Sequence, residues 1–314
     1  MNQIAWLEKN IAEVEQLLAA DREAAQKNPE SFSAKLSLQS TENRLVDLQK
    51  QLQLEKDKRE KEVIDFRLSG NQLDRGTIPL DVLSKLAQTI SESLHSVAYR
   101  LQKGRDPNSS IPKKLRRTLD IRLAGLEFGS TRLLITSETR PNLFGQSLAE
   151  DAIDAVFNVI NSKTEEEMGD AVAAAGLRAS RSISRMCNVL LKYNAQVEMS
   201  WGAPAGEDRV FKGSSNNLQQ LSQSLDDLVE VPTEVLHVVG TLAMSSIRGQ
   251  FEIVTETIKY KGKYPDSLLA QVKRVPLGSK VQAEIEKETI ENKTTGYVKE
   301  VFRLVDITKS IEYS

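Results

Sequence analysis

The sequence contains very few of the residues that disulfide scaffolds and metal sites require. Its 314 residues include 1 Cys and 2 His. The single cysteine, Cys187, cannot form an intrachain disulfide, which agrees with a reducing compartment. A structural zinc site draws four ligands from Cys and His, so one chain cannot assemble it. We therefore expect no metal ion and no cofactor, and we interpret Cys187 as a buried thiol.

Long apolar runs and an excess of either charge are also missing. The longest apolar stretch, residues 235–244, is far shorter than the roughly 20 residues of a membrane-spanning helix. The 42 Lys and Arg residues nearly cancel the 44 Asp and Glu residues, which leaves a net charge of −2. This balance argues against a globally basic nucleic-acid binder. The first residues lack the basic-then-apolar pattern of a signal peptide, so we expect a cytoplasmic protein without a membrane partner.

The usual motifs of enzymes are absent as well. The sequence has no G-x-x-x-x-G-K-[ST] loop, no G-x-G-x-x-G, no H-E-x-x-H and no nucleophile elbow. Glu150 and Asp154 lie four residues apart in a predicted helix, but they have no further candidate metal ligands. His95 and His237 have no nucleophile fixed beside them, so we interpret both as structural.

One pattern keeps a metal-dependent nuclease among the alternatives. Pro265-Asp266 followed by Glu291-Asn292-Lys293 has the letters of the PD-(D/E)xK nuclease motif. In those nucleases the second group lies on a buried strand, where carboxylates and lysine converge on a metal ion and a water. Here the first pair falls at a predicted helix start and the second group at a hydrophilic turn. We therefore predict that the protein is not an enzyme.

Residues 1–62 have the apolar spacing of two paired helices. A stripe only two residues wide per heptad is typical of a coiled-coil seam rather than of a globular core face. Asn28-Pro29 interrupts the pattern and restarts a helix. The spacing predicts an antiparallel helical hairpin, or arms that pair with another copy of the chain. We assign self-association to the seam residues Ile4, Leu7, Ile11, Val14, Leu18, Leu45, Leu48 and Leu52.

Residues 63–230 change to a mixture of strand and helix periods. Ile64, Phe66 and Leu68 alternate with polar residues, which predicts a half-buried strand. A turn at 74–76 and a helix after Pro79 follow. We then expect a hairpin of strands 119–123 and 132–136, helices at 148–159, 165–175 and 177–193, strands near 195–201 and 209–212, and a helix at 215–229. This order predicts an α+β domain with helices covering an antiparallel sheet.

Residues 234–314 are almost all strand. Val231-Pro232-Thr233 is the best candidate for a linker before them. Alternating residues predict strands at 235–244, 249–255, 258–264, 281–285 and 298–304, with a short helix at 266–273. Five strands with a helix between the third and the fourth resemble the order of the OB-fold barrels. The resemblance is one of topology, so an SH3-like small barrel remains an alternative.

The clearest local charge imbalance lies between residues 100 and 122, where eight cations face two acids. A basic loop can contact phosphates with little geometric demand. No aromatic residue lies between Leu101 and Arg122 to stack on a base, which argues against single-strand recognition by this loop. The cations that we assign to nucleic-acid contact are Arg100, Lys103, Arg105, Lys113, Lys114, Arg116 and Arg117.

Two further basic stripes occur. Lys259, Lys261 and Lys263 alternate with Ile258, Tyr260 and Tyr264 along one predicted strand, so lysines and rings point to opposite faces. The lysines either contact nucleic acid or protect an edge strand. A predicted helix carries Arg178, Arg181, Arg185 and Lys192, which either meet a phosphate-bearing ligand or pair with Glu165 to Glu167.

These observations favour a non-enzymatic, oligomerising scaffold component of a multi-protein assembly. Its partners would be a second copy and another protein, recognised through the C-terminal barrel. The alternative is a nucleic-acid-binding accessory protein that uses the basic loop at 100–122. A role in bacterial antiviral defence or in a toxin–antitoxin system is compatible with either build. Whether the three basic stripes form one surface cannot be derived from sequence spacing.

Overall fold

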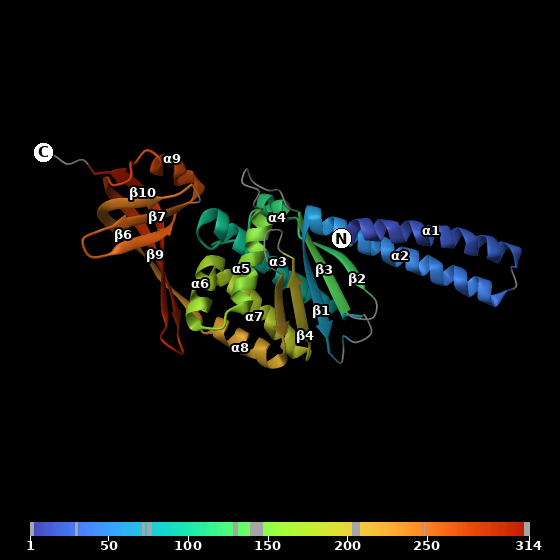
Figure 1. Ribbon diagram of the computed structural model, residues 1–314. Helices are drawn as coiled ribbons and strands as arrows, with labels where there is room; N and C mark the ends of the chain where they lie inside the picture. Colours follow the sequence, from blue (N-terminus) through green and yellow to red (C-terminus); the bar gives the residue numbers. More distant parts are fainter. Residues whose placement is uncertain are drawn as a thin grey trace.

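The computed structural model describes residues 3–28, 31–70, 73, 77–127, 131–138, 147–202, 208–247 and 249–310. Side chains are not described for residues 3–6, 8, 53–61, 126–127, 138 and 266. The predicted turn at 74–76, and residues 128–130 between the two strands of the predicted hairpin, lie outside the described residues. The chain forms a helical arm, a central α+β unit and a C-terminal barrel, with the arm and the barrel at opposite ends (Figure 1). The mixed α+β class is therefore confirmed.

The arm is an antiparallel pair of helices, α1 (Gln3–Lys27) and α2 (Phe32–Glu60). Its seam closes within one chain: Leu7, Val14 and Leu18 are buried where α1 packs on α2. Ile11, Leu45, Leu48 and Leu52 are half-buried, and the side chain of Ile4 lies outside the described residues. The seam that we assigned to self-association is thus occupied in the single chain, because the two helices supply each other's apolar stripe.

Polar contacts fix the register and the turn of the arm. Thr41 in α2 donates to Asp21 in α1 over 2.6 Å, and Ser37 donates to the same carboxylate over 3.1 Å. These bonds explain why a polar residue is tolerated in the seam. The cap of α2 is Ser31, whose Oγ accepts from the backbone N–H of Ala34 over 3.3 Å, rather than Asn28.

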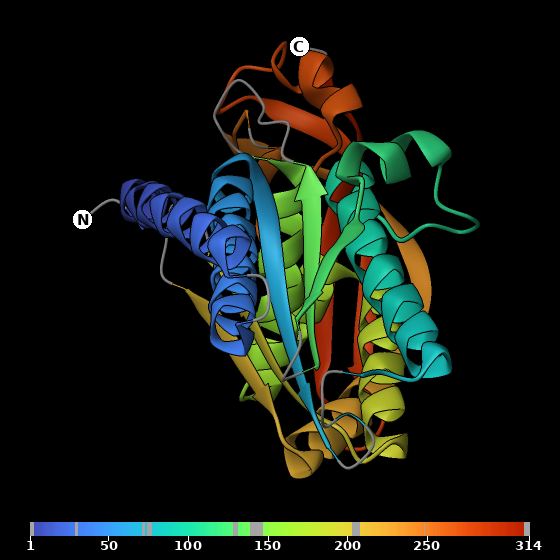
Figure 2. The same cartoon turned by 90° about the vertical axis from the view of Figure 1, so that its right-hand side faces the viewer.

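The central unit contains an antiparallel five-stranded sheet of order β2-β3-β1-β4-β5. Its strands are β1 (Lys61–Ser69), β2 (Arg122–Glu127), β3 (Thr131–Glu138), β4 (Gln196–Trp201) and β5 (Arg209–Gly213). The helices are α3 (Leu80–Lys103), α4 (Lys113–Leu119), α5 (Leu148–Asn161), α6 (Glu165–Ala175), α7 (Leu177–Lys192) and α8 (Ser215–Asp226). Helices α3 and α5–α7 cover the face of the sheet that lies away from the arm (Figures 1 and 2).

Alternation in β1 builds the core beneath these helices. Ile64, Phe66 and Leu68 are buried in the apolar cluster that also contains Val97 of α3 and Phe157 of α5. The strand predicted at 119–123 is wrong at its start, because Leu119 ends α4 and β2 begins at Arg122. The helix predicted at 215–229 is too long, since β6 begins at Leu228.

The C-terminal unit is a closed barrel of order β10-β8-β7-β6-β9. Its elements are β6 (Leu228–Ser245), β7 (Gln250–Val254), β8 (Lys259–Lys263), the short helices η1 (Asp266–Leu268) and α9 (Leu269–Val272), β9 (Lys280–Asn292) and β10 (Val298–Lys309). The prediction of a small five-stranded barrel is confirmed. Pairs are antiparallel except that of β10 with β8.

A glycine permits the closure of the barrel. Gly262 in β8 is the register partner of Phe302 in β10. A Cβ at residue 262 would lie 1.9 Å from the carbonyl oxygen of Phe302, so any larger residue would push the strands apart. The side chains of Phe251, Ile253, Ile285 and Leu304 fill the interior.

The barrel is joined to the central unit by more than one strand. Val231, Pro232 and Thr233, which we predicted as a linker, lie inside β6, where the register with β9 shifts between Val231 and Glu234. Proline lacks an N–H donor, so a bulge is a position at which a strand accepts it. Leu228 in β6 and Ile290 in β9 belong to the apolar cluster of the central unit.

The β9–β10 hairpin also contacts the central unit directly. The backbone N–H of Lys293 donates to the carbonyl oxygen of Asp227 over 3.0 Å. Tyr297 packs on Gly169 of α6, where a Cβ would come within 2.6 Å of the ring, and Lys299 forms an ion pair with Asp170. These contacts hold the barrel against α6 and α8. A cleft remains at the junction between α7 of the central unit and strands β8 and β10 of the barrel.

Candidate nucleic-acid interface

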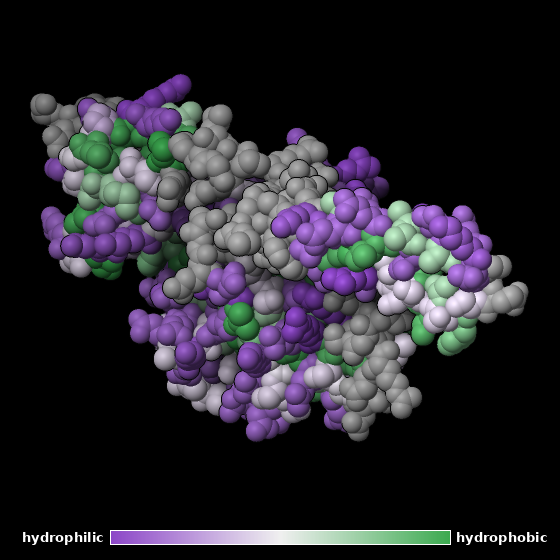
Figure 3. Space-filling model, turned by 45° about the vertical axis from the view of Figure 1, so that its right-hand side comes forward, coloured by the Kyte–Doolittle hydropathy of each residue, from purple (hydrophilic) through white to green (hydrophobic). Residues whose placement is uncertain are grey.

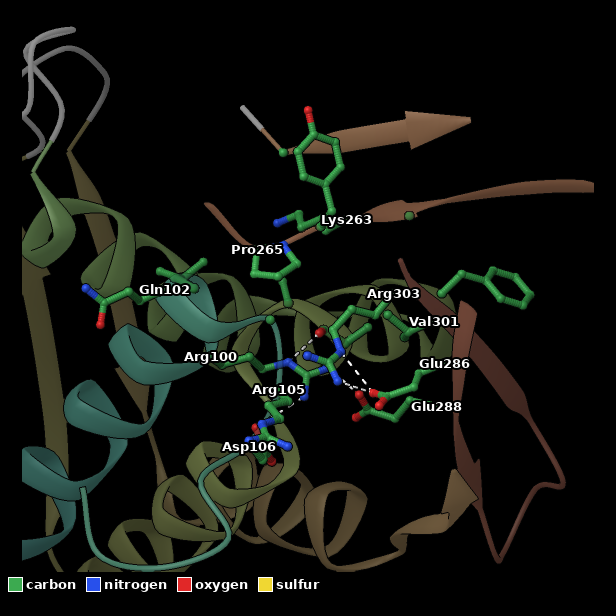
Figure 4. A pocket seen from close by; sticks show the side chains of 18 of the residues that line it. Arg100, Gln102, Arg105, Asp106, Lys263, Pro265, Glu286, Glu288, Val301 and Arg303 are labelled. Carbon is green, nitrogen blue, oxygen red and sulfur yellow. Dashed lines mark hydrogen bonds and ion pairs between the residues drawn. The ribbon is translucent and has the colours of Figure 1, made fainter. Parts of the chain in front are cut away.

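A large cleft separates the central unit from the barrel (Figure 4). The end of α3, residues 104–108 and α7 form one wall, and β8 with β10 forms the other. The cleft has a volume of ≈ 2110 Å³. Pockets for small molecules usually measure about 300–1,000 Å³, so the cleft exceeds what a small ligand fills.

The floor of the cleft is a buried arginine that joins the two units. Arg100, only 5% exposed, donates from Nε to the carbonyl oxygen of Ala173 over 2.9 Å. Its terminal nitrogens donate to Asp106 over 3.2 Å and, across the junction, to Glu288 in β9 over 3.0 Å. Burial alone would lower the pKa of Arg100, but the carboxylates of Glu288 and Asp106 outweigh burial and raise it. Arg100, which we predicted to contact nucleic acid, thus has donors that are occupied inside the protein.

The segment after α3 is held in place rather than free. The carboxylate of Asp106 accepts from the backbone N–H of Arg178 over 2.9 Å, and the Arg178 guanidinium donates to the carbonyl oxygens of Pro107 and Ser109. Gly176, with φ +93, makes room for this contact, since a Cβ there would lie 2.0 Å from Asp106. Arg178 therefore fixes the chain direction that leads into α4.

Helix α4 turns part of the predicted basic loop into an ordered ridge. Leu115 and Leu119, four residues apart, are buried and anchor the helix. The cations between them consequently face solvent. The sequence analysis did not predict α4. Its seven residues include only two apolar side chains, Leu115 and Leu119, which are too few to show a helical period.

The remaining cations of this segment are exposed. Within the described part of the chain, the structure shows no carboxylate within 4.0 Å of any of them, whereas Arg122 is paired with Asp120. We call this set the basic ridge. Its members are Lys103, Arg105, Lys113, Lys114, Arg116 and Arg117.

The barrel contributes lysines beside this ridge. Lys259, Lys261 and Lys263 are exposed on β8, and the last two line the cleft. Lys263 is in register with Arg303 in β10, whose Cδ would lie 3.1 Å from a Cβ on Gly104. Lys263 and the start of the basic ridge therefore meet at the cleft, beside Lys261, which forms an ion pair with Glu252 over 3.1 Å. Strand β8 pairs with both β7 and β10, so our edge-protection reading of its lysines is wrong for Lys263.

The rings of Tyr260 in β8 and of Tyr264 directly after it point into the barrel, as the alternation predicted. Tyr260 meets Phe302 edge-on with ring centroids 5.3 Å apart. The hydroxyl of the buried Tyr264 donates to the carbonyl oxygen of Ser246 over 2.5 Å. Lysines and aromatic faces thus lie on opposite sides of this strand.

The arginines of the predicted arginine helix lie in different environments. Arg178 holds residues 107–109, and Arg185 forms an ion pair with Glu92 of α3 over 2.7 Å. Arg181 is exposed and lines the cleft. Each basic stripe therefore contributes at least one exposed cation to the same cleft, namely Arg105, Arg181 and Lys263. Sequence spacing could not have shown this.

Acidic side chains of the cleft are mostly in ion pairs. Glu286 pairs with Arg303, and Glu300 pairs with Lys287 over 2.8 Å. Glu230 is exposed at the cleft; burial first, and then Glu288 and Asp106, raise its pKa, while Arg100 and Arg181 lower it. The cleft thus has near-balanced charge, unlike the basic ridge beside it.

Comparison of the chain with models of known families, with curated proteins and with solved structures found no match. The function must therefore be argued from the site.

The residues that kept a nuclease among the alternatives lie in different settings. Glu291 is in register with Val298 in the hairpin that reaches the central unit, whereas Asp266, whose side chain is not described, begins η1 on the barrel. Across the residues that the structure describes, no group of three His, Cys, Asp or Glu side chains is arranged to hold a metal ion. Asp154 forms an ion pair with Arg209 over 2.7 Å.

Cysteine and histidine occupy separate environments. Cys187 is buried in α7, and burial raises the pKa of its thiol to about 12, so a reactive thiolate is disfavoured at neutral pH. His95 is buried in α3 with Nδ1 2.7 Å from the carbonyl oxygen of Ser91, and burial lowers its pKa. His237 is exposed on β6, opposite Glu284 of β9.

Proposed function

We propose that the protein binds nucleic acid through its phosphate backbone, using the basic ridge and the β8 lysines beside it. One observation carries the proposal: the ridge cations are exposed and, among the described residues, have no carboxylate partner. Cations without internal partners gain from contact with phosphates, because each contact releases condensed counterions. The near-neutral composition is no obstacle, since the charge is concentrated on one segment.

The form of the barrel supports the same proposal. We propose that it is of the OB type, because one parallel pair closes the five strands and a helical segment separates β8 from β9. OB barrels bind oligonucleotides on the face of their second and third strands. The corresponding strands here are β7 and β8, and β8 carries Lys259, Lys261 and Lys263.

Neutralising α4 tests the proposal. We expect the variant Lys113→Ala/Lys114→Ala/Arg116→Ala/Arg117→Ala to bind a nucleic-acid probe of about 20 base pairs about 100-fold more weakly, because phosphate contacts are lost. The slope of log K against log salt should become shallower by about one unit per lost contact. Fluorescence anisotropy between low and moderate salt measures both quantities.

A matched control distinguishes the loss of the basic ridge from the loss of net positive charge. The variant Lys35→Ala/Arg44→Ala/Lys50→Ala/Lys212→Ala removes the same charge from exposed sites on the arm and on β5. It should bind as the unchanged protein does. Wild-type protein that fails to bind at low salt, or two variants that bind equally, would refute the proposal. Circular dichroism checks that both variants remain folded.

A scaffold that self-associates remains the second candidate function. Two exposed apolar side chains at the outer part of the arm favour it. Phe32 is 78% exposed and Leu36 is 54% exposed, and they lie one turn apart in α2. The visible face in Figure 3 shows small groups of apolar side chains on the arm, beside a mostly hydrophilic central unit. Exposed apolar pairs of this kind occur at helix–helix contacts.

Light scattering tests this second candidate. If the arms of two copies pair through these side chains, the wild-type protein will have the mass of a dimer and Phe32→Ser/Leu36→Ser that of a monomer. Leu80→Ser, which replaces another exposed leucine away from the arm, should leave the mass unchanged. A monomeric wild-type protein rules out self-association through the arm.

A further inference from the structure

We infer that the nucleic acid bound by the basic ridge is a duplex, so that the protein discriminates against single strands. The inference rests on the proposed function and names its substrate class. It follows from the shape of the surface that bears the free cations, from the charge of the neighbouring cleft and from the positions of the aromatic rings.

Four of the six cations of the basic ridge lie on the projecting helix α4, whereas Lys103 ends α3 and Arg105 lines the cleft. Leu115 and Leu119 hold α4 to the body, so Lys113, Lys114, Arg116 and Arg117 point outward. These four residues are absent from the lining of the cleft. Figure 2 shows α4 standing out at the rim of the molecule, on the side toward the barrel. A projecting cationic helix can approach the phosphates that border a groove, whereas single strands are bound along a groove of the protein.

The cleft itself presents a single strand with mixed charge, because Arg105, Arg181 and Lys263 line it together with several carboxylates. Of its charged lining residues, Arg100, Arg303 and Lys299 are engaged by Glu288, Glu286 and Asp170. Glu230 adds exposed negative charge to the same surface, whereas Glu300 is paired with Lys287. A polyanion threaded through the cleft would therefore meet carboxylates as well as cations. The four cations of α4, in contrast, lie outside the cleft and have no carboxylate within 4.0 Å among the described residues.

The aromatic rings at the cleft are not free to stack on bases. Phe251 is fully buried, Tyr264 is buried with its hydroxyl bonded to Ser246, and Phe302 lies against Tyr260. Binding of single strands takes much of its free energy from base stacking on such rings. The cations of the basic ridge attract a ligand by its density of negative charge. A duplex carries one negative charge per about 1.7 Å of its axis. The surface thus fits the duplex better than the flexible strand.

Competition between matched probes tests the inference. We expect a duplex of about 20 base pairs to bind at least about tenfold more tightly than either of its separated strands at the same salt. Parallel DNA and RNA duplexes show which backbone geometry the ridge accepts. Tyr260→Leu should leave the affinity for the duplex unchanged, because its ring packs inside the barrel.

The outcomes distinguish this inference from the proposed function. If single strands bind as tightly as the duplex and the α4 alanine variant still loses affinity, the phosphate interface stands and the duplex preference is wrong. If Tyr260→Leu weakens binding about tenfold while the protein remains folded, stacking contributes and the inference also fails. If neither probe binds at low salt, the proposed function fails first.

Discussion

Replacing Arg100 by methionine should lower the free energy of unfolding by about 3–5 kcal/mol, because breaking a buried ion pair leaves the remaining charges unpaired. The variant retains a long apolar stem but removes the donors to Asp106 and Glu288 and to the Ala173 carbonyl oxygen. Since Glu288 belongs to β9, the loss also weakens the junction between the barrel and the central unit. Urea denaturation followed by circular dichroism measures the change.

Two comparisons make the Arg100 prediction specific. Arg105→Met alters an exposed cation five positions away and should change stability by less than about 0.5 kcal/mol. Adding Asp106→Asn and Glu288→Gln to Arg100→Met should recover part of the loss, because neutral amides cost less to bury than carboxylates. Equal midpoints for Arg100→Met and Arg105→Met would show that the buried cluster does not stabilise the junction.

Truncating Trp201 to alanine should cost about 3–5 kcal/mol, the range for removing a large aromatic side chain from a core. Trp201 is 2% exposed, stacks on Phe157 with ring centroids 6.1 Å apart and donates from Nε1 to Glu62 over 2.6 Å. The variant therefore creates a cavity and also removes the hydrogen-bond donor of a buried carboxylate.

The loss should depend on pH in a defined direction. Burial raises the pKa of Glu62, and the bond from Trp201 opposes that rise. A folded-state pKa above the unfolded value contributes stability that is present at low pH and is lost as pH rises through the folded pKa. Without Trp201 the pKa rises further, so the destabilisation should be larger at pH 7 than at pH 4. Val210→Ala, on the neighbouring strand and 43% exposed, should show neither effect.

Local patterns were enough to predict the three parts of the fold. The heptad spacing in the arm and the alternation in Ile64, Phe66 and Leu68 are short-range signals, and the structure bears out the elements that they predicted. The strands and the short helix of the barrel were located in the same way. Element ends were less certain, as the starts of β2 and β6 show, because helix and strand compete for the same apolar residues there.

The candidate site depends on contacts that no local pattern contains. Arg100 and Glu288 are separated by 188 positions in the chain, so the sequence could not reveal that one cation of the basic segment is buried. The composition also placed Pro232 in a linker, whereas long-range pairing with β9 keeps the flanking residues in one strand. Where the burial of a charged side chain is decided by a distant partner, residue spacing alone predicts the wrong environment.

The hairpin that extends from the barrel onto the central unit also decides where the chain can be divided. A domain folds on its own when its hydrophobic core is complete within its own segment. Here β9 supplies Ile290 to the core of the neighbouring unit, and Lys293 and Tyr297 contact Asp227 and Gly169. A barrel cut out at Pro232 would expose Ile290 and lose the contacts of its hairpin, and the remaining unit would lose part of its interior. A cut at this position therefore leaves neither piece with a complete core.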